Sequence, residues 1–343
     1  MKRKTKIALL LFLAGALHLM AISAGFIAPY DFAEQDREFP FAPPTRVHFA
    51  VSRHEAYLRP VVCPMKEREI GVYAEDLQNC SPVRFFVRGS PYKFLGLAPS
   101  TRHLFGVDPP ARIFPLGTDG YGRDVFSRLL YGSQISLFAG LLATFLSLAI
   151  GASLGTIAGY YGKWVDAIVM RCAELFLALP WLYLLFALRA FLPLHISPIE
   201  AFLLLIAVIG LVGWARPARL VRGIVLSGRE RHYVLAARVF GGSDFYLMRR
   251  HILPLTYSVL VTQAAWLIPQ YILAEVTLSF LGLGVGEPAP SWGNMLTTLQ
   301  QYHVAVSYWW MWAPGFVLIP VFLSYSLLAG ALQRTDSNAG GGL

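Results

Sequence analysis

One apolar stretch of the sequence carries the polar residues best suited to chemistry inside a membrane. Glu275 lies near the end of the run 255–276. Gln263, Trp266 and Gln270 precede it at roughly helical spacing. A carboxylate at membrane depth is expected to face a water-filled cavity or a partner group. These four residues predict a polar translocation pathway, and hydrogen bonding between helices is the structural alternative.

Nucleotide chemistry is not expected from this chain. A phosphate-binding loop has the pattern G-x-x-x-x-G-K-[ST], and Lys163 is the lysine that comes nearest to it. Trp164 follows Lys163, however, and Ile157 stands in the first glycine position. The chain is therefore predicted to be non-catalytic and to bind no cofactor. The energy for any transport must then come from a partner or from an ion gradient.

The cysteines and histidines predict no metal site and no catalytic set. Cys63, Cys80 and Cys172 fit no zinc-binding spacing. His18, a histidine within an apolar run, has no obvious ligand or nucleophile beside it, which argues against a membrane-embedded hydrolase. Cys63 and Cys80 could form a disulfide in an oxidising compartment, or they could remain two free thiols.

The elements that position these residues must lie in a membrane. The 343 residues are 56% hydrophobic and only 14% charged, whereas a soluble domain has about 25% charged residues. The net charge is +9, but the arginines flank apolar runs and do not form one basic face. Nucleic-acid binding is therefore not expected. We expect an integral membrane protein in contact with lipid.

The apolar runs predict an all-α transmembrane bundle with six spans, because each approaches the roughly 20 residues that cross a bilayer. The first run follows the basic start MKRKTK and is longer than the about 7–15 residues of a signal-peptide core. We expect a retained span there, with a cleaved signal peptide as the alternative. The six runs are residues 7–28, 135–160, 165–189, 197–215, 255–276 and 309–331.

The distribution of arginine predicts the topology. Eight arginines lie within 216–254, whereas the stretches 190–197 and 277–308 contain no lysine or arginine. Cytoplasmic loops of membrane proteins carry an excess of these residues. The segment 216–254 and both termini are therefore predicted to be cytoplasmic, and the protein is predicted to be a multi-pass protein of a bacterial inner membrane.

The polar, proline-rich segment after the first span predicts an extracytoplasmic insert. Its alternating stretches VHFAVS (47–52) and VRFFVRG (83–89) predict some β structure. The predicted organisation is a cytoplasmic end with the first span over 1–28, the insert over 29–112, a core with five spans over 113–335, and a flexible tail over 336–343.

The stretch YVLAARVFGGSDFYLMRRHILPL, residues 233–255, is too basic to cross the bilayer, because each arginine at a helix centre costs about 2.5–3.5 kcal/mol. It predicts two short helices joined by a hinge. Gly241 and Gly242 can end the first helix in a left-handed cap, and Ser243 can cap the second, with Asp244 in its first turn. Pro254 would fix where the next span begins.

The first of these helices is predicted to present a small surface. Tyr233, Ala236, Ala237 and Phe240 fall at helical spacing on one face. Small side chains permit close approach by another protein. An amphipathic helix lying on anionic lipid is the alternative.

The same stretch resembles the cytoplasmic loop signature of ABC importer permeases, E-A-A-x3-G-x9-I-x-L-P. It stands here as Leu235-Ala236-Ala237, then Gly241, then His251-Ile252-Leu253-Pro254. Leu235 replaces the signature glutamate, and His251 stands in the position of the signature isoleucine. The segments 115–137, 157–180 and 278–296 are similar to the dipeptide, oligopeptide and nickel branch of that family.

The resemblance implies a permease subunit that forms half of a pore for peptides or similar small solutes. It implies a second homologous permease, two ATPase subunits that use ATP and magnesium, and a solute-binding protein as partners. An ion-coupled secondary transporter that uses intramembrane carboxylates is the alternative. By resemblance, the coupling site for the ATPases comprises Leu235, Ala236, Ala237, Arg238, Gly241, Asp244 and Pro254.

Two further patterns concern a surface helix and the packing of two helices. The turn GTDGYGRD, residues 117–124, predicts the start of an amphipathic surface helix that contains Arg123, Asp124 and Arg128, and the family places this region near the docking face of the binding protein. Glycines at 151, 155 and 159 repeat every fourth residue, a spacing that lets two helices approach closely. Packing within the subunit is favoured over packing between subunits.

Overall fold

The apolar runs form helices in the computed structural model, which describes residues 3–51, 58–69, 71–94, 98–191 and 197–340. A helix satisfies every backbone hydrogen bond within itself, as a chain in lipid requires. The long helices are α1 (Arg3–Ile22), α3 (Val125–Tyr161), α10 (Tyr257–Phe280) and α13 (Ala313–Gly340). Two pairs follow α3: α4 (Lys163–Ala178) with α5 (Trp181–Ala190), and α6 (Pro198–Gly213) with α7 (Ala215–Gly228).

Four helices in the described residues are long and apolar enough to cross a membrane, or up to six if each bent pair counts as one span. The predicted span 165–189 is bent by 94° between α4 and α5, because Pro180 lacks an N–H and disfavours helix at the preceding residue. Pro269 lies inside α10, which remains one helix. The predicted span 197–215 continues, after a bend of 44°, as α7.

Short elements connect these helices. Residues 192–196 of the predicted loop 190–197 lie outside the described residues, and of the predicted tail 336–343 the described part continues α13 to Gly340. The short helices are α2 (Ala24–Ile27), α8 (His232–Val239), α9 (Asp244–Leu247), α11 (Trp292–Leu296) and α12 (Tyr302–Ser307). A π-helical turn, η1, spans Met248–Ile252, and 3-10 turns span Leu253–Thr256 (η2), Thr297–Gln300 (η3) and Trp309–Trp312 (η4).

The described residues between α2 and α3 form six strands. An antiparallel sheet has the order β1-β2-β5-β6, and β3 pairs with β4. The pairing of Val62 with Ser81 brings their neighbours Cys63 and Cys80 together, and the structure joins these two cysteines in a disulfide. The strands are β1 (Val47–Val51), β2 (Leu58–Val62), β3 (Met65–Glu69), β4 (Val72–Glu75), β5 (Ser81–Phe94) and β6 (Ala98–Val107). Ser52 of the predicted stretch 47–52 lies outside the described residues.

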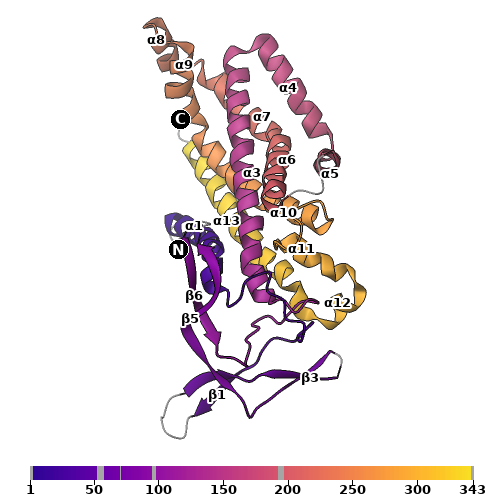
Figure 1. Ribbon diagram of the computed structural model, residues 1–343. Helices are drawn as coiled ribbons and strands as arrows, with labels where there is room; N and C mark the ends of the chain where they lie inside the picture. Colours follow the sequence, from indigo (N-terminus) through magenta and orange to yellow (C-terminus); the bar gives the residue numbers. More distant parts are fainter. Residues whose placement is uncertain (1–2, 52–57, 70, 95–97, 192–196, 341–343) are drawn as a thin grey trace. The chain divides into compact units, whose positions relative to one another are not determined.

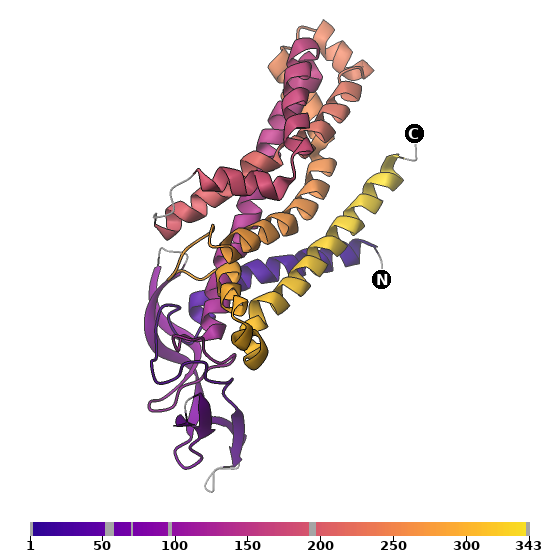
Figure 2. The ribbon, with the colours of Figure 1, turned by 90° about the vertical axis from the view of Figure 1, so that its right-hand side faces the viewer.

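Two compact units are built from these elements. We call Met1–Ala14, Ala139–Leu278 and Val321–Leu343 the helical unit, and Gly15–Phe138 with Ser279–Pro320 the mixed unit. Helices α1, α3, α10 and α13 contribute residues to both. Within the helical unit, α8 and α9 lie at the same end as the turn between α3 and α4 (Figures 1 and 2).

The repeated glycines of α3 form the contact face with α7. A Cβ atom added at Gly151 would lie 2.8 Å from the Trp214 carbonyl oxygen, and one at Gly155 would lie 2.4 Å from that of Ala218. One added at Gly159 would lie 2.9 Å from the Arg222 carbonyl oxygen. The predicted use of this repeat in packing within the subunit is confirmed.

Candidate functional site

The arginine-rich stretch forms the predicted pair of helices, which we call the elbow (α8 and α9, residues 232–247). Helix α8 ends before Gly241, whose φ of 88° is a left-handed conformation that glycine adopts without strain. The Ser243 side chain accepts a hydrogen bond from the Tyr246 N–H, which caps α9, and Asp244 occupies the first turn. The local prediction of helix, hinge and helix is therefore confirmed.

The elbow packs within the subunit by a face other than the one predicted to be presented to another protein. Val234, Leu247 and Ile252 are buried with Tyr160 of α3 and Val225 of α7. Of the four residues predicted to share a face, Ala237 packs partly against this cluster. Tyr233, Ala236 and Phe240 are exposed.

The exposed side of α8 is more apolar than the alanine-lined surface that the sequence predicted. Phe240 is 89% and Val239 is 85% exposed, and Leu235 is 43% exposed. An apolar patch of this size on a polar segment is typical of a surface that another molecule covers.

A polar anchor fastens the elbow to the end of α3. The Tyr160 hydroxyl donates to Asp244 Oδ1 at 2.5 Å and accepts from Arg238 Nη2 at 2.8 Å. Arg229 donates from Nη1 to the carbonyl oxygens of Gly159 and Tyr160. These hydrogen bonds join the elbow and the preceding residue Arg229 to the end of α3. The sequence pointed to Arg238 and Asp244, but not to Tyr160.

The elbow is also continuous with α10. The π-helical turn Met248–Ile252 and the 3-10 turn Leu253–Thr256 follow α9 and lead into α10. Pro254 stands within the first two positions of the 3-10 turn, where its missing N–H leaves no hydrogen bond unmade. The elbow and α10 are thus joined by a continuous run of helical turns.

The four predicted pathway residues do not share one exposed face of α10. Trp266 is 37% exposed, Gln270 is exposed and Gln263 is half-buried. Glu275 is fully buried. The structure thus brings Gln270 and Trp266 to the surface of α10 and places Glu275 inside.

A hollow of about 460 Å³ lies in the helical unit, beside two helix bends and the part of α10 that contains Pro269. It is lined by Pro180 and Trp181 at the α4–α5 bend, by Gly213 before the α6–α7 bend, and by Gln270 beside Pro269 of α10. Arg216 also lines it. Of the predicted pathway residues, Gln270 is the one that contacts this hollow.

A buried charged cluster occupies the mixed unit. Arg123 donates to Asp119 Oδ2 and to Glu287 Oε2, both at 2.7 Å, and Arg128 donates to Glu287 Oε1 at 2.8 Å. Arg123, Asp124 and Arg128 are 6%, 3% and 2% exposed. The predicted amphipathic surface helix is wrong at this place. These charges tie the turn 117–124 to the loop before α11, a distant partner that the sequence did not indicate.

Burial raises the pKa of Asp124 from 3.8 to about 7, against hydrogen bonds from the Ser127 N–H and hydroxyl that favour the charged form. The folded carboxyl keeps its proton up to about pH 7, whereas the unfolded one loses it near 3.8. Its contribution to stability is therefore complete below about 3.8 and is lost as the pH rises to about 7.

We expect the thermal unfolding temperature of the solubilised protein to fall between about pH 4 and about pH 7, with this carboxyl contributing at most roughly 4 kcal/mol. Asp124→Asn keeps a side-chain oxygen that can cap α3 but does not titrate. Unfolding followed by circular dichroism should show a flatter pH dependence for the variant. Equal slopes for both proteins would contradict a titrating Asp124.

The family described as the binding-protein-dependent transport system inner membrane component matches residues 151–335. The chain is similar to the dipeptide transport system permease protein DppC of Bacillus subtilis, with 36% identity over 225 residues, 66% of this chain and 68% of that protein. It is 34% identical over 235 residues to DppC of Alkalihalophilus pseudofirmus, 68% of this chain and 71% of that protein. The family match contains the elbow, α10 and most of α13, and begins after the strands.

Proposed function

Because the chain belongs to the family of binding-protein-dependent transport system inner membrane components, we propose that it forms half of a peptide pore that separate ATPase subunits drive through the elbow. The protein is a permease subunit of an ABC importer and a multi-pass inner membrane protein. An ion-coupled transporter is not favoured by these similarities. The peptide substrate is proposed because two relatives are named dipeptide permeases.

The observation that carries the coupling proposal is the exposed apolar end of α8 on an anchored elbow. Val239 and Phe240 are left uncovered in this chain, while Val234 on the opposite side is buried against α3 and α7. A partner that covers Leu235, Val239 and Phe240 would remove apolar surface from water. We propose the ATPase subunit as that partner, with Leu235, Ala236, Ala237, Arg238, Gly241, Asp244 and Pro254 in or beside the contact.

The proposed mechanism is mechanical coupling. Closure of the ATPases around nucleotide and magnesium would push the elbow, and the anchor at Tyr160 would carry the push to α3. Continuity through Pro254 would carry it to α10, whose exposed Gln270 and Trp266 we propose to line the pathway, with Glu275 supporting it from inside. Nucleotide drives such a switch only because it binds the two conformations with different affinity.

The remaining parts of the proposal concern assembly and topology. We propose six spans, with each bent helix pair counted as one, and both termini in the cytoplasm. The strands would then lie outside the cytoplasm, where the disulfide between Cys63 and Cys80 is stable. A second homologous permease, two ATPases and a solute-binding protein would complete the transporter, and nucleotide would be bound by the ATPases alone.

Phe240→Asp is expected to lower co-purification of the ATPase and ATP-dependent peptide uptake by about tenfold or more, because a charge would replace an apolar contact that the partner buries. The change is on an exposed side chain, so the unfolding temperature should not fall. Tyr302→Asp is the matched control, since Tyr302 is 82% exposed on α12 of the mixed unit. Equal ATPase recovery for both variants would remove the elbow from the coupling site.

A further inference from the structure

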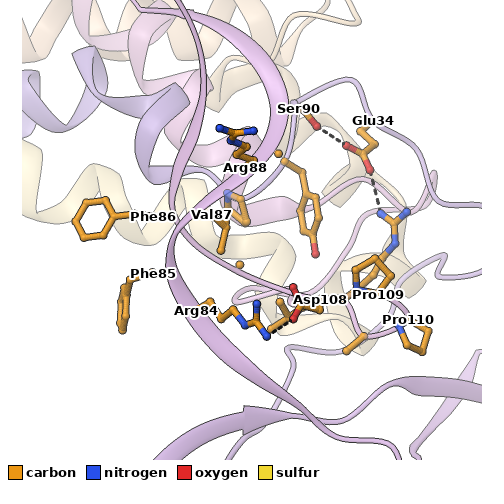
Figure 3. Close-up of a pocket in the computed structure, with 17 residues that line it drawn as sticks. Glu34, Arg84, Phe85, Phe86, Val87, Arg88, Ser90, Asp108, Pro109 and Pro110 are labelled. Atoms are coloured by element: carbon orange, nitrogen blue, oxygen red, sulfur yellow. Dashed lines mark hydrogen bonds and ion pairs between the residues drawn. The ribbon is translucent and has the colours of Figure 1, made fainter.

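The ribbon formed by β5 and β6 in the mixed unit carries a pair of uncovered aromatic side chains. Phe85 and Phe86 are each 65% exposed. Figure 3 shows both rings directed away from Glu34 and Pro110, on the other side of the strand. Adjacent exposed phenylalanines are unusual on a surface that faces only water, and they indicate a contact with a partner or a membrane.

The backbone at Phe86 is held in an uncommon conformation. Its φ is 56°, in the left-handed region that bulky residues rarely adopt. The flanking residues stay paired, Phe85 with Phe105 and Val87 with His103. Strain of this kind persists only where the surroundings fix it, and it gathers at functional positions.

The aromatic pair lies at the end of the first membrane helix. The Phe86 ring lies 6.2 Å from the ring of Phe26 in α2, and α2 starts two residues after α1 ends. The apolar part of α1, Thr5–Ile22, has 18 residues and spans about 27 Å, close to the thickness of the hydrocarbon core. Phe26 is four residues beyond Ile22, which places it about 6 Å further, within the headgroup layer.

Buried contacts hold the β5–β6 ribbon against the residues that follow α1. His103 is 1% exposed, and its Nδ1 lies 2.5 Å from the Ala28 carbonyl oxygen, while its Nε2 lies 2.9 Å from that of Ser90 on β5. A Cβ atom added at Gly25 would lie 2.4 Å from the Tyr92 ring. The position of Phe86 next to the end of α1 is therefore fixed by packing on both strands.

The charges on the ribbon match an anionic surface. Arg88 and Arg102 are exposed and directly opposite each other across the two strands, where like charges repel. Within the described part of the chain, neither guanidinium has a carboxylate in ion-pair contact. Lys93 is exposed further along β5. Phosphate groups placed between the arginines would relieve this repulsion.

We propose that the β5–β6 ribbon lies on the bilayer surface at the end of α1, with Phe85 and Phe86 inserted at the headgroup boundary and Arg88 and Arg102 bound to phosphates of anionic lipid. Exposed aromatic rings beside cationic side chains are typical of this boundary. The continuity with α1 favours lipid over a protein partner. The proposal does not depend on the solute or on the coupling site.

Depth-dependent fluorescence quenching tests the proposal on the full chain in vesicles. In a Cys172→Ser background, Phe86→Cys is labelled with an environment-sensitive fluorophore, and nitroxide lipids or aqueous iodide serve as quenchers. The matched control is Phe49→Cys, because Phe49 is 66% exposed on β1, at the opposite edge of the sheet from β6. Both changes replace an exposed phenylalanine of the same unit.

Nitroxide lipid is expected to quench the label at 86 roughly threefold more than the label at 49, and iodide to do the reverse. Equal quenching at both positions would overturn the proposal. Protection from iodide at 86 that arises only when the solute-binding protein or another subunit is added, without lipid quenching, would identify a protein contact and also overturn it.

The role of the arginines is tested by lipid composition. Quenching at 86 should be stronger in vesicles with phosphatidylglycerol than in phosphatidylcholine alone, and added salt should weaken the difference. Arg88→Gln with Arg102→Gln should abolish the dependence on phosphatidylglycerol while Phe86 stays near the bilayer. A dependence that survives in the double variant would refute lipid binding by these two residues.

Discussion

Gly155→Ala is expected to lower the free energy of unfolding of the solubilised protein by about 1–3 kcal/mol, the usual result of forcing an extra carbon into a packed contact. The new Cβ would lie 2.4 Å from the Ala218 carbonyl oxygen and 3.0 Å from Val221 Cβ. The backbone oxygen of Ala218 cannot rotate away from the new Cβ as a flexible side chain could. The whole of α7 must therefore shift. The measurement is thermal unfolding in detergent, with ATP-dependent uptake in vesicles as a second readout.

The control is Gly223→Ala on α7, because a Cβ at Gly223 would have no heavy atom within 4 Å. Both variants gain about 0.8–1.0 kcal/mol of helix propensity, so their difference isolates the steric effect. Gly223→Ala should unfold at the same or a higher temperature. If Gly155→Ala behaved in the same way, the close contact of α3 with α7 would not exist in the membrane protein.

The glycine repeat shows how much of the helix packing can be predicted from residue spacing alone. A small residue at every fourth position predicts a close helix contact, and the sequence could not say which helix makes it. The partner, α7, was hidden because the prediction weighed the arginines of 216–254 as a loop signal. The periodic apolar residues there are the missed signal. In the structure the buried residues of α7 are Ala215, Pro217, Ala218, Val221, Val225 and Gly228.

The elbow shows that local rules are reliable where the interactions are local. The left-handed glycine and the Ser243 cap involve residues a few positions apart, so sequence predicts them. The anchor joins Tyr160 to Asp244 across 84 residues, and no pattern in one sequence encodes that pairing. The packed face of the elbow was not predicted for the same reason, since burial of Val234 depends on α3 and α7.

The pathway prediction was limited by helix geometry. Gln263 and Gln270 are seven residues apart, close to two turns, so they share a side of α10. Glu275 follows Gln270 by five residues, which rotates it by about 140° around the axis. The exposure of Gln270 and the burial of Glu275 agree with this rotation. The helical repeat by itself therefore separates the carboxylate from the stripe of glutamines.

Asp119→Ala is expected to cost about 3–5 kcal/mol of the free energy of unfolding, the usual effect of removing one partner from a buried ion pair. Asp119 is 4% exposed and accepts from Arg123 Nε at 2.7 Å, with Arg128 Nε at 3.7 Å. Glu287 cannot compensate both guanidiniums, because its side chain is 50% exposed and partly solvated. The Arg123 and Arg128 guanidiniums would then stay buried beside one partly solvated carboxylate, that of Glu287.

Arg171→Ala is the comparison, because it also removes an ion pair. The Arg171 and Glu174 side chains are 84% and 56% exposed and 3.4 Å apart, and such a pair contributes about 0.5 kcal/mol or less. Thermal unfolding of the two variants in the same detergent should therefore differ by many degrees. Equal losses would mean that water reaches Arg123 and Arg128 in the folded protein. The cluster would then be a hydrated surface, and Asp119 would not be needed to balance the charge of the two arginines.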